Sequence, residues 1–147
     1  MDWVGLFLKP RGRLGRGAFW LGFAVLAALQ GAACLAPHIG WLAFMLLAYS
    51  WVCLYAKRLH DIGRSGWLTL APVLVTLFGL SAAAAFWVQS LEAKNGAWLY
   101  VPSVGALAIA SGIDLLFIVW IGLCPGEADE NPFGPALKHR TPTETDD

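Results

Sequence analysis

Charged side chains are scarce in this sequence. Asp, Glu, Lys and Arg make up 14% of the residues, whereas a soluble domain usually carries about 25%. Ten basic residues balance ten acidic ones, so the chain lacks the basic excess that nucleic-acid binding requires. The scarcity of charge argues against a soluble domain, and we expect no nucleic-acid partner.

Cysteine is also scarce, with only Cys34, Cys53 and Cys124 in the chain. The count is odd and no Cys-x-x-Cys spacing occurs, which excludes a disulfide framework. His60 beside Asp61 supplies too few ligands for a metal ion. We therefore predict no metal and no other cofactor, and we interpret the cysteines as small apolar residues in helices.

Long apolar runs are abundant, and 58% of the residues are hydrophobic. A helix rises about 1.5 Å per residue and the hydrocarbon core of a bilayer is about 30 Å thick, so each of four runs can cross it. The runs are apolar on all sides, unlike the helices of a soluble core. We predict an all-α integral membrane bundle of four transmembrane helices, over residues 18–36, 39–56, 67–90 and 101–123.

Two further segments flank this predicted transmembrane domain of residues 18–124. We expect residues 1–17 to form a basic N-terminus in the cytoplasm or at the membrane interface, and residues 125–147 to form a cytoplasmic tail with a disordered end. The first apolar run resembles a signal peptide, because basic residues precede it. It is longer than the roughly 7–15 residues of a signal-peptide core, so we interpret it as an uncleaved span.

The basic residues predict the orientation of the spans, since they are enriched in cytoplasmic loops. Nine lie before the first span, after the second span or in the tail, and one lies in the other two connections. Both termini and the central loop are therefore predicted to face the cytoplasm. The nine are Lys9, Arg11, Arg13, Arg16, Lys57, Arg58, Arg64, Lys138 and Arg140, and the exception is Lys94.

The central loop concentrates the polar residues of the chain. It reads KRLHDIGRSGW from Lys57 to Trp67. If the second span continues as a helix, Asp61 lies four residues from Lys57 and three from Arg58, and an ion pair of Arg58 with Asp61 would hold the loop. Ser65 could cap the third span, and the backbone amides of the turn could hold a lipid phosphate. The alternatives are a purely structural connector between spans and a catalytic role for His60.

This loop resembles the hallmark of the DUF805 family of bacterial inner-membrane proteins. Two other segments resemble its remaining motifs, namely GRLGRGAFW from Gly12 to Trp20 and GEADENPFGP from Gly126 to Pro135. The resemblance covers nearly the whole chain. It implies four helices, a bacterial inner membrane and no established activity.

The predicted topology places all three segments on the cytoplasmic side, where their polar residues can converge. We expect one binding site there for an anionic lipid headgroup or a partner protein, because arginine suits phosphate through two parallel hydrogen bonds. The predicted site residues are Arg13, Arg16, Trp20, Lys57, Arg58, His60, Asp61, Arg64, Ser65, Trp67 and Asn131.

Asp114 is the one charged residue inside a predicted span. An ionised carboxylate at the bilayer centre costs at least about 2.5–3.5 kcal/mol, so the side chain should face the interior of the bundle. Either a cation or proton relay or a structural hydrogen bond accounts for it. Its possible polar neighbours are Gln30, Tyr49, Ser50, Thr76 and Ser111.

Three functions are consistent with these features, and we assign no catalytic residue. The leading interpretation is a non-enzymatic scaffold or interaction protein that binds anionic lipids or a membrane-protein partner. The alternative is a small transporter or channel subunit that uses Asp114 and forms homo-oligomers. The third is a membrane enzyme that uses His60 and Asp61, for which the sequence offers no nucleophile.

Overall fold

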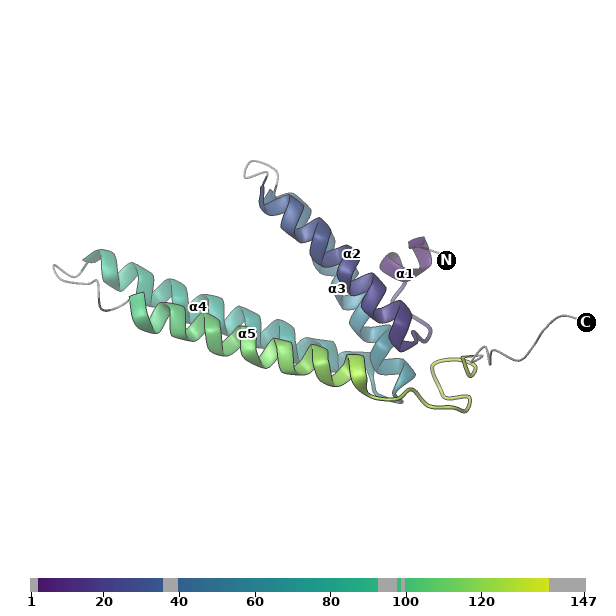
Figure 1. Cartoon of the computed structure of the whole chain (residues 1–147). Coiled ribbons are helices and arrows are strands. Elements are labelled where there is room, and N and C mark those ends of the chain that lie inside the picture. Colours follow the sequence, from purple (N-terminus) through teal and green to yellow (C-terminus); the bar gives the residue numbers. More distant parts are fainter. Residues whose placement is uncertain (1–2, 36–39, 93–97, 99, 138–147) are drawn as a thin grey trace, which may run out of the picture. The chain divides into compact units, whose positions relative to one another are not determined.

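Helices account for the regular structure of the chain (Figure 1). The computed structural model describes residues 3–35, 40–92, 98 and 100–137. The all-α prediction is confirmed, since the described residues contain no strand beyond an isolated bridge from Asn131 to Gly134. The elements are α1 (Trp3–Leu8), α2 (Arg16–Cys34), α3 (Gly40–Asp61), the 3₁₀ turn η1 (Gly66–Thr69), α4 (Leu70–Glu92) and α5 (Tyr100–Leu123).

Four of the described helices, α2, α3, α4 and α5, are long and apolar enough to cross a membrane. The four predicted spans are thus found, and they indicate a multi-pass membrane protein. Most helix bounds differ from the predicted ones by a few residues, and two differences bear on the site. Helix α3 continues beyond residue 56 to Asp61, and the N-terminal segment contains the additional helix α1. Lys94, Lys138 and Arg140, which entered the orientation argument, lie outside the described residues.

The chain divides into two compact units. The first comprises Met1–Gly66 and Gly122–Asp147, and the second comprises Trp67–Ile121. Each unit contains one pair of the spanning helices, α2 with α3 and α4 with α5. The packing of the two pairs into a single bundle stays a prediction, as does the cytoplasmic location of both termini.

Aromatic rings join α2 to α3 in the first unit. The ring of Phe19 lies 6.3 Å from that of Tyr55, and one turn along, Phe23 lies 5.2 Å from Trp51. Because the residue number rises along α2 while it falls along α3 in these pairs, the two helices run antiparallel. Gly22 allows close approach, because a Cβ atom there would lie 2.8 Å from Leu54 Cδ1. Helix α1 packs on α3, and its Leu6 is buried. The aromatic contacts therefore fix the helix pair whose ends carry the polar residues.

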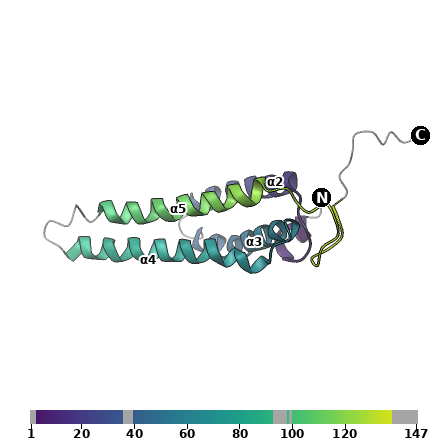
Figure 2. The same cartoon turned by 90° about the horizontal axis from the view of Figure 1, so that it is seen from below.

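The second unit is an antiparallel helix pair, and α4 and α5 lie side by side in both views (Figures 1 and 2). Trp87 packs edge-to-face on Tyr100, with ring centroids 5.1 Å apart. Nearer the middle, Gly79 faces Ala110 so closely that a Cβ on Gly79 would lie 2.5 Å from the Cβ of Ala110. Small residues at such a contact let membrane helices approach without a hydrophobic driving force.

Replacement of Gly79 by Ala should destabilise this helix pair. The added methyl group overlaps Ala110, and overpacking of this kind costs about 1–3 kcal/mol. Gly112→Ala is the matched control, because nothing lies within 4 Å of a Cβ at that position and Ala is the better helix former. Thermal unfolding in detergent micelles should show a lower Tm for Gly79→Ala only. Equal Tm values for the two variants would contradict the close contact.

Candidate functional site

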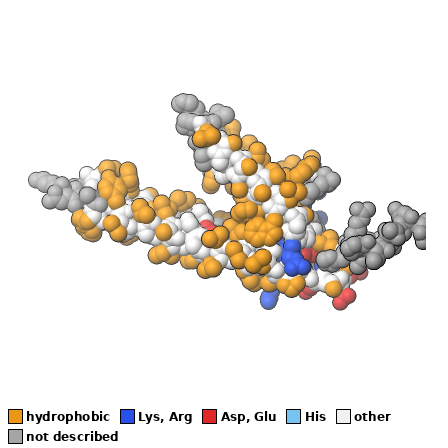
Figure 3. All heavy atoms as spheres, in the orientation of Figure 1, with side chains coloured by type: hydrophobic (Ala, Val, Ile, Leu, Met, Phe, Trp, Pro, Cys, Tyr) orange, Lys and Arg blue, Asp and Glu red, His pale blue; other side chains and the backbone are white. Residues whose placement is uncertain are grey.

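The polar residues of the first unit gather at the end of α3, whereas hydrophobic side chains cover the visible surfaces of the spans (Figure 3). Lys57, Arg58 and Asp61 occupy the last turns of that helix and are all buried. Arg58 is 0% exposed and Asp61 is 3% exposed. Buried charges require partners, so the contacts of these side chains determine what the site does.

Asp61 pairs with two arginines at once. Its Oδ1 accepts a hydrogen bond from Arg13 Nε at 3.1 Å, and its Oδ2 accepts one from Arg58 Nη1. The predicted ion pair between Arg58 and Asp61 is confirmed. Arg13 reaches the same carboxylate from the N-terminal segment, 48 residues away in the chain. Each carboxylate oxygen therefore has a charged donor.

Arg58 connects two further parts of the first unit. Its Nη1 donates to the carbonyl oxygen of Leu14 at 3.2 Å, and its Nη2 donates to the carbonyl oxygen of Cys124. Leu14 precedes α2 and Cys124 follows α5. Because the guanidinium presents its donors in a fixed planar fork, this one side chain sets the spacing between both segments and Asp61.

Arg13 binds the C-terminal segment through its remaining donors. Nη1 donates to the carbonyl oxygens of Asp129 at 2.6 Å and Pro135 at 3.5 Å, and Nη2 donates to the carbonyl oxygen of Glu127. Three carbonyls from one short stretch thus surround a single guanidinium. The N-terminal and C-terminal segments are held together by this arginine.

His60 and Asn131 form a second connection between the same segments. His60 Nδ1 lies 3.2 Å from the carbonyl oxygen of Gly12, which can only accept, so Nδ1 carries the proton. The imidazole stacks on the Phe133 ring, with centroids 4.1 Å apart and 5° between planes. Asn131 Nδ2 donates to the carbonyl oxygen of His60 at 2.9 Å. His60 thus serves as a packing surface for the C-terminal segment.

Gly126 brings the C-terminal backbone against Asp61. A Cβ at Gly126 would lie 2.2 Å from Asp61 Oδ2, so any side chain there would displace the carboxylate. The next residue, Glu127, donates its backbone N–H to the carbonyl oxygen of Asp61 at 2.8 Å. Gly126 was absent from the residues predicted for the site. The sequence did contain a signal for it, because Gly126 is the first residue of the C-terminal motif.

We call Arg13, Arg58, His60, Asp61 and Asn131, with the backbone groups that they bind, the polar interlock. The structure brings these five predicted residues together from three distant segments. It also directs the guanidinium groups of Arg13 and Arg58 at internal acceptors. A role for these residues in binding a headgroup stays a prediction.

The other predicted residues lie outside the polar interlock. Arg16, Arg64 and Ser65 are exposed. Trp20 packs against Gly122, where a Cβ would lie 2.5 Å from Trp20 Cζ2. Trp67 begins the second unit and is 78% exposed.

Lys57, the remaining predicted residue, attaches helix α1 to α3. Its ammonium donates to the carbonyl oxygens of Gly5 and Leu6, the latter at 3.2 Å, in the last turns of α1. Tyr49 strengthens the attachment, since its hydroxyl donates to the carbonyl oxygen of Leu8 at 3.2 Å. Carbonyl groups at a helix C-terminus attract positive charge. Lys57 therefore holds α1 in place.

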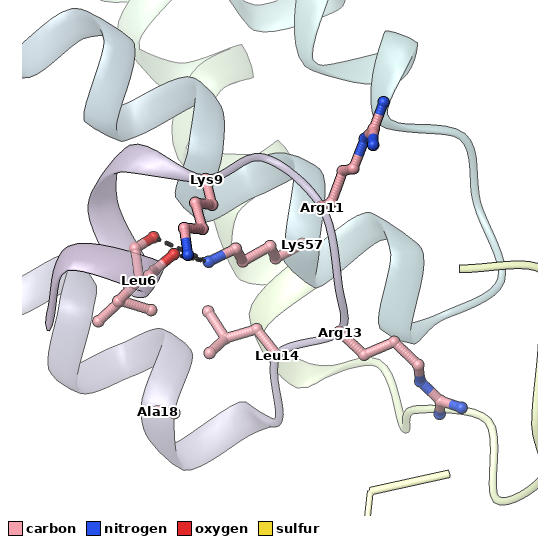
Figure 4. A pocket seen from close by; sticks show the side chains of 8 residues that line it. Leu6, Lys9, Arg11, Arg13, Leu14, Ala18 and Lys57 are labelled. Atoms are coloured by element: carbon pink, nitrogen blue, oxygen red, sulfur yellow. Dashed lines mark hydrogen bonds between the residues drawn. The ribbon is translucent and has the colours of Figure 1, made fainter. Parts of the chain in front are cut away.

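A pocket of about 400 Å³ opens beside α1 (Figure 4). Four basic residues line it, and among the described residues no acidic side chain does. In Figure 4 Lys9 and Lys57 extend toward the carbonyls of α1, whereas Arg11 and Arg13 direct their guanidinium groups away. We call this space the α1 pocket. Lys9 and Lys57 supply its charged groups.

A second cavity, of about 600 Å³, lies between the start of α2 and the C-terminal segment. Arg16 lines it, and so do the acidic residues Asp61 and Glu127. Its mixed charge suits an anion less well than the α1 pocket, whose described lining contains no acidic side chain.

Asp114 belongs to the second unit. Thr76 Oγ1 donates to its Oδ2 at 2.6 Å, so Thr76 is the predicted neighbour that contacts it. Its Oδ1 is inaccessible and has no hydrogen-bond partner among the described residues. Of the other proposed neighbours, Gln30, Tyr49 and Ser50 fall in the first unit, and Ser111 is exposed.

Four helices that are long and apolar enough to cross a membrane indicate a class, the multi-pass membrane proteins. The family model described as "Protein of unknown function (DUF805)" matches residues 7–135, so the chain belongs to this family. The matched region contains all three segments of the polar interlock, and the resemblance inferred from them is confirmed. No curated protein and no solved structure matches the chain.

Asp61→Asn should strongly destabilise the first unit. The substitution leaves Arg58, which is 0% exposed, without its carboxylate, and removal of one partner from a buried ion pair costs about 3–5 kcal/mol. Asp129→Asn removes the same charge from an exposed side chain and keeps the backbone carbonyl that Arg13 binds. Unfolding in detergent should therefore distinguish the two variants. Equal stabilities would show that Asp61 does not hold the segments together.

Proposed function

We propose that this protein is a non-enzymatic protein of the bacterial inner membrane. Its polar end, by which we mean the polar interlock and the exposed basic residues around it, faces the cytoplasm and binds anionic lipid headgroups. The observation that carries this proposal is the exposure of basic residues around the polar interlock. Asp61 is already paired with two arginines, while four other basic residues of the first unit are exposed. The exposed cations are Lys9, Arg11, Arg16 and Arg64.

Helix α1 supports a position at the membrane surface. Trp3, Val4 and Leu8 are 46%, 62% and 54% exposed, and the Trp3 ring stacks on Phe7 with centroids 6.0 Å apart. An apolar face followed directly by Lys9 and Arg11 is typical of a segment that lies in the headgroup layer. Tryptophan favours the same depth.

A lipid is favoured over a protein partner by the location of these charges. The spans hold the polar end among headgroups permanently, so the ligand is present at high local concentration. Each basic residue close to an anionic leaflet contributes about 1 kcal/mol of attraction. Binding of a protein partner by the same basic residues would be detected in the experiment below.

The engagement of His60 and Asp61 supports a non-enzymatic role. Both oxygens of Asp61 accept hydrogen bonds from arginines, and His60 Nδ1 faces a backbone carbonyl. A general acid or base needs access to the proton that it transfers. Within the described residues, no group of three or more His, Cys, Asp and Glu side chains is arranged to hold a metal ion.

Neutralisation of exposed cations should reduce the enrichment of anionic lipid around the protein. We expect the triple variant Arg11→Gln, Arg16→Gln, Arg64→Gln to lose at least about tenfold in preference for phosphatidylglycerol over phosphatidylcholine, at about 1 kcal/mol per charge. Mass spectrometry of lipids retained in nanodiscs measures this preference. Arg64→Gln alone is compared with Lys94→Gln, which removes one charge from the predicted opposite side.

Two results would contradict the proposal. One is a wild-type protein that retains anionic and zwitterionic lipid equally. The other is a triple variant that retains phosphatidylglycerol as the wild type does. If the triple variant instead loses a protein that copurifies with the wild type, the basic surface serves a protein partner.

Asp114 favours one alternative function, that of an oligomeric transporter or channel subunit. The observation behind it is the Oδ1 atom, which is buried and has no hydrogen-bond partner among the described residues, since an acid inside the membrane is by default a functional hypothesis. This alternative predicts cation or proton flux in proteoliposomes that Asp114→Asn abolishes and Ser111→Ala leaves intact. The lipid-binding proposal predicts no flux above that of protein-free liposomes.

A further inference from the structure

The segment that follows α5 covers the guanidinium group of Arg13, and we call its residues 125–135 the C-terminal strap. Resting on the proposed function, we propose that this strap masks a phosphate-binding site on Arg13. A phosphate group, carried by an anionic lipid headgroup or by a soluble molecule, displaces the strap and takes its place. The C-terminal strap is then an internal competitor of the ligand, which regulates how strongly the polar end binds anionic lipid.

The terminal nitrogens of Arg13 carry the first part of the argument. Nη1 donates to the carbonyl oxygens of Asp129 and Pro135, and Nη2 donates to that of Glu127. These acceptors are neutral backbone groups, whereas an arginine fork forms its strongest hydrogen bonds with a carboxylate or a phosphate. Displacement of the strap therefore frees the two nitrogens that suit a phosphate. The bond from Nε to Asp61 does not depend on the strap.

The attachment of the C-terminal strap carries the second part. None of its residues, all of which the structure describes, is buried, and a cavity of about 600 Å³ lies between this segment and the start of α2. Its ring contact is the stack of Phe133 on His60. Segments with few buried apolar contacts open locally at low free-energy cost. The carbonyl of Cys124, just before the strap, is bound by Arg58 and can stay in place when the strap opens.

The acidic side chains of the C-terminal strap add a third part. Glu127, Asp129 and Glu130 are all exposed, and Glu127 lines the same cavity as the exposed Arg16. Negative charges at this position repel an anionic leaflet and offset the attraction of the nearby cations. Displacement of the strap moves these three acids away from the basic residues and uncovers Arg13 in the same step.

Amide hydrogen exchange in nanodiscs of two lipid compositions tests the displacement without any substitution. The Glu127 amide reports on the strap, because it donates to the Asp61 carbonyl at 2.8 Å. The Arg64 amide donates to the Leu59 carbonyl at 2.8 Å and is the internal control outside the strap. Replacing phosphatidylcholine by phosphatidylglycerol should accelerate exchange at Glu127 at least about tenfold, and at Arg64 less than about threefold. The closed form remains the major one in both lipids.

Variants that loosen the C-terminal strap should retain more anionic lipid. Phe133→Ala removes the ring that stacks on His60, and Asn131→Ala removes the amide that binds the His60 carbonyl. Pro132→Ala, which changes an exposed side chain between them, is the matched control. We expect both loosened variants to raise the preference for phosphatidylglycerol over phosphatidylcholine at least about threefold above the control. Thermal unfolding in detergent checks that all three remain folded.

Arg13→Lys, added to Phe133→Ala, tests whether Arg13 itself holds the phosphate. Lysine keeps the positive charge but lacks the planar fork, so the double variant should lose at least about half of the gain in phosphatidylglycerol retention. A gain that persists in full would contradict a phosphate site on Arg13. Inorganic phosphate added to phosphatidylcholine nanodiscs identifies the source of the phosphate. If it accelerates exchange at Glu127 by itself, the masked site takes a soluble ligand.

Other results would overturn the masking and separate it from the proposed function. Equal exchange at Glu127 in both lipids, with phosphatidylglycerol still preferred, would contradict the displacement and leave the proposed function standing. Equal lipid retention in Phe133→Ala and Pro132→Ala would contradict it as well. If no form of the protein prefers phosphatidylglycerol, the proposed function fails. The response of Glu127 to inorganic phosphate then decides the masked site alone.

Discussion

The charge balance around Asp61 is the constraint on which the polar end of this protein depends. One buried carboxylate has to compensate two arginines, Arg13 and Arg58, which come from different segments. Neither charge could be buried alone, because an unpaired ion in a low-dielectric environment is strongly disfavoured. The excess positive charge and the remaining donors are satisfied by backbone carbonyls from both ends of the first unit. The segments near the two ends of the chain are thereby connected to the end of a transmembrane helix.

The hydrogen bonds around Asp61 show a structural role for residues of the family motifs. Arg13, Arg58 and Asn131 resemble ligand-binding residues in the sequence, yet each donates hydrogen bonds inside the protein. The polar interlock is therefore first an architectural element, which builds a defined surface at the ends of the spans. The proposed lipid contact therefore depends on exposed cations such as Arg16 and Arg64, which belong to the same motifs.

The sequence allowed most of the fold to be predicted, because lipid-spanning helices depend on length and hydropathy, which are local properties. The pair of Arg58 with Asp61 was also predictable from its spacing within a helix. The partnership of Arg13 with the carbonyls of Glu127 and Asp129 was not, since it depends on how distant backbone segments approach. Helix α1 was missed because six residues are too few for a clear periodic pattern. Its attachment through Lys57 is likewise a tertiary contact.

Amide hydrogen exchange of the C-terminal segment tests the polar interlock most directly. The segment after α5 is folded back on Asp61, so the Glu127 amide should be protected by its bond to the Asp61 carbonyl at 2.8 Å. The Gly134 amide, bonded to the Asn131 carbonyl at 3.0 Å, should be protected as well. Exchange in the membrane-embedded protein should therefore be far slower at both positions than in an unstructured peptide of the same sequence. Exchange at the peptide rate would show that the C-terminal segment is not held, and would contradict the central role of Asp61.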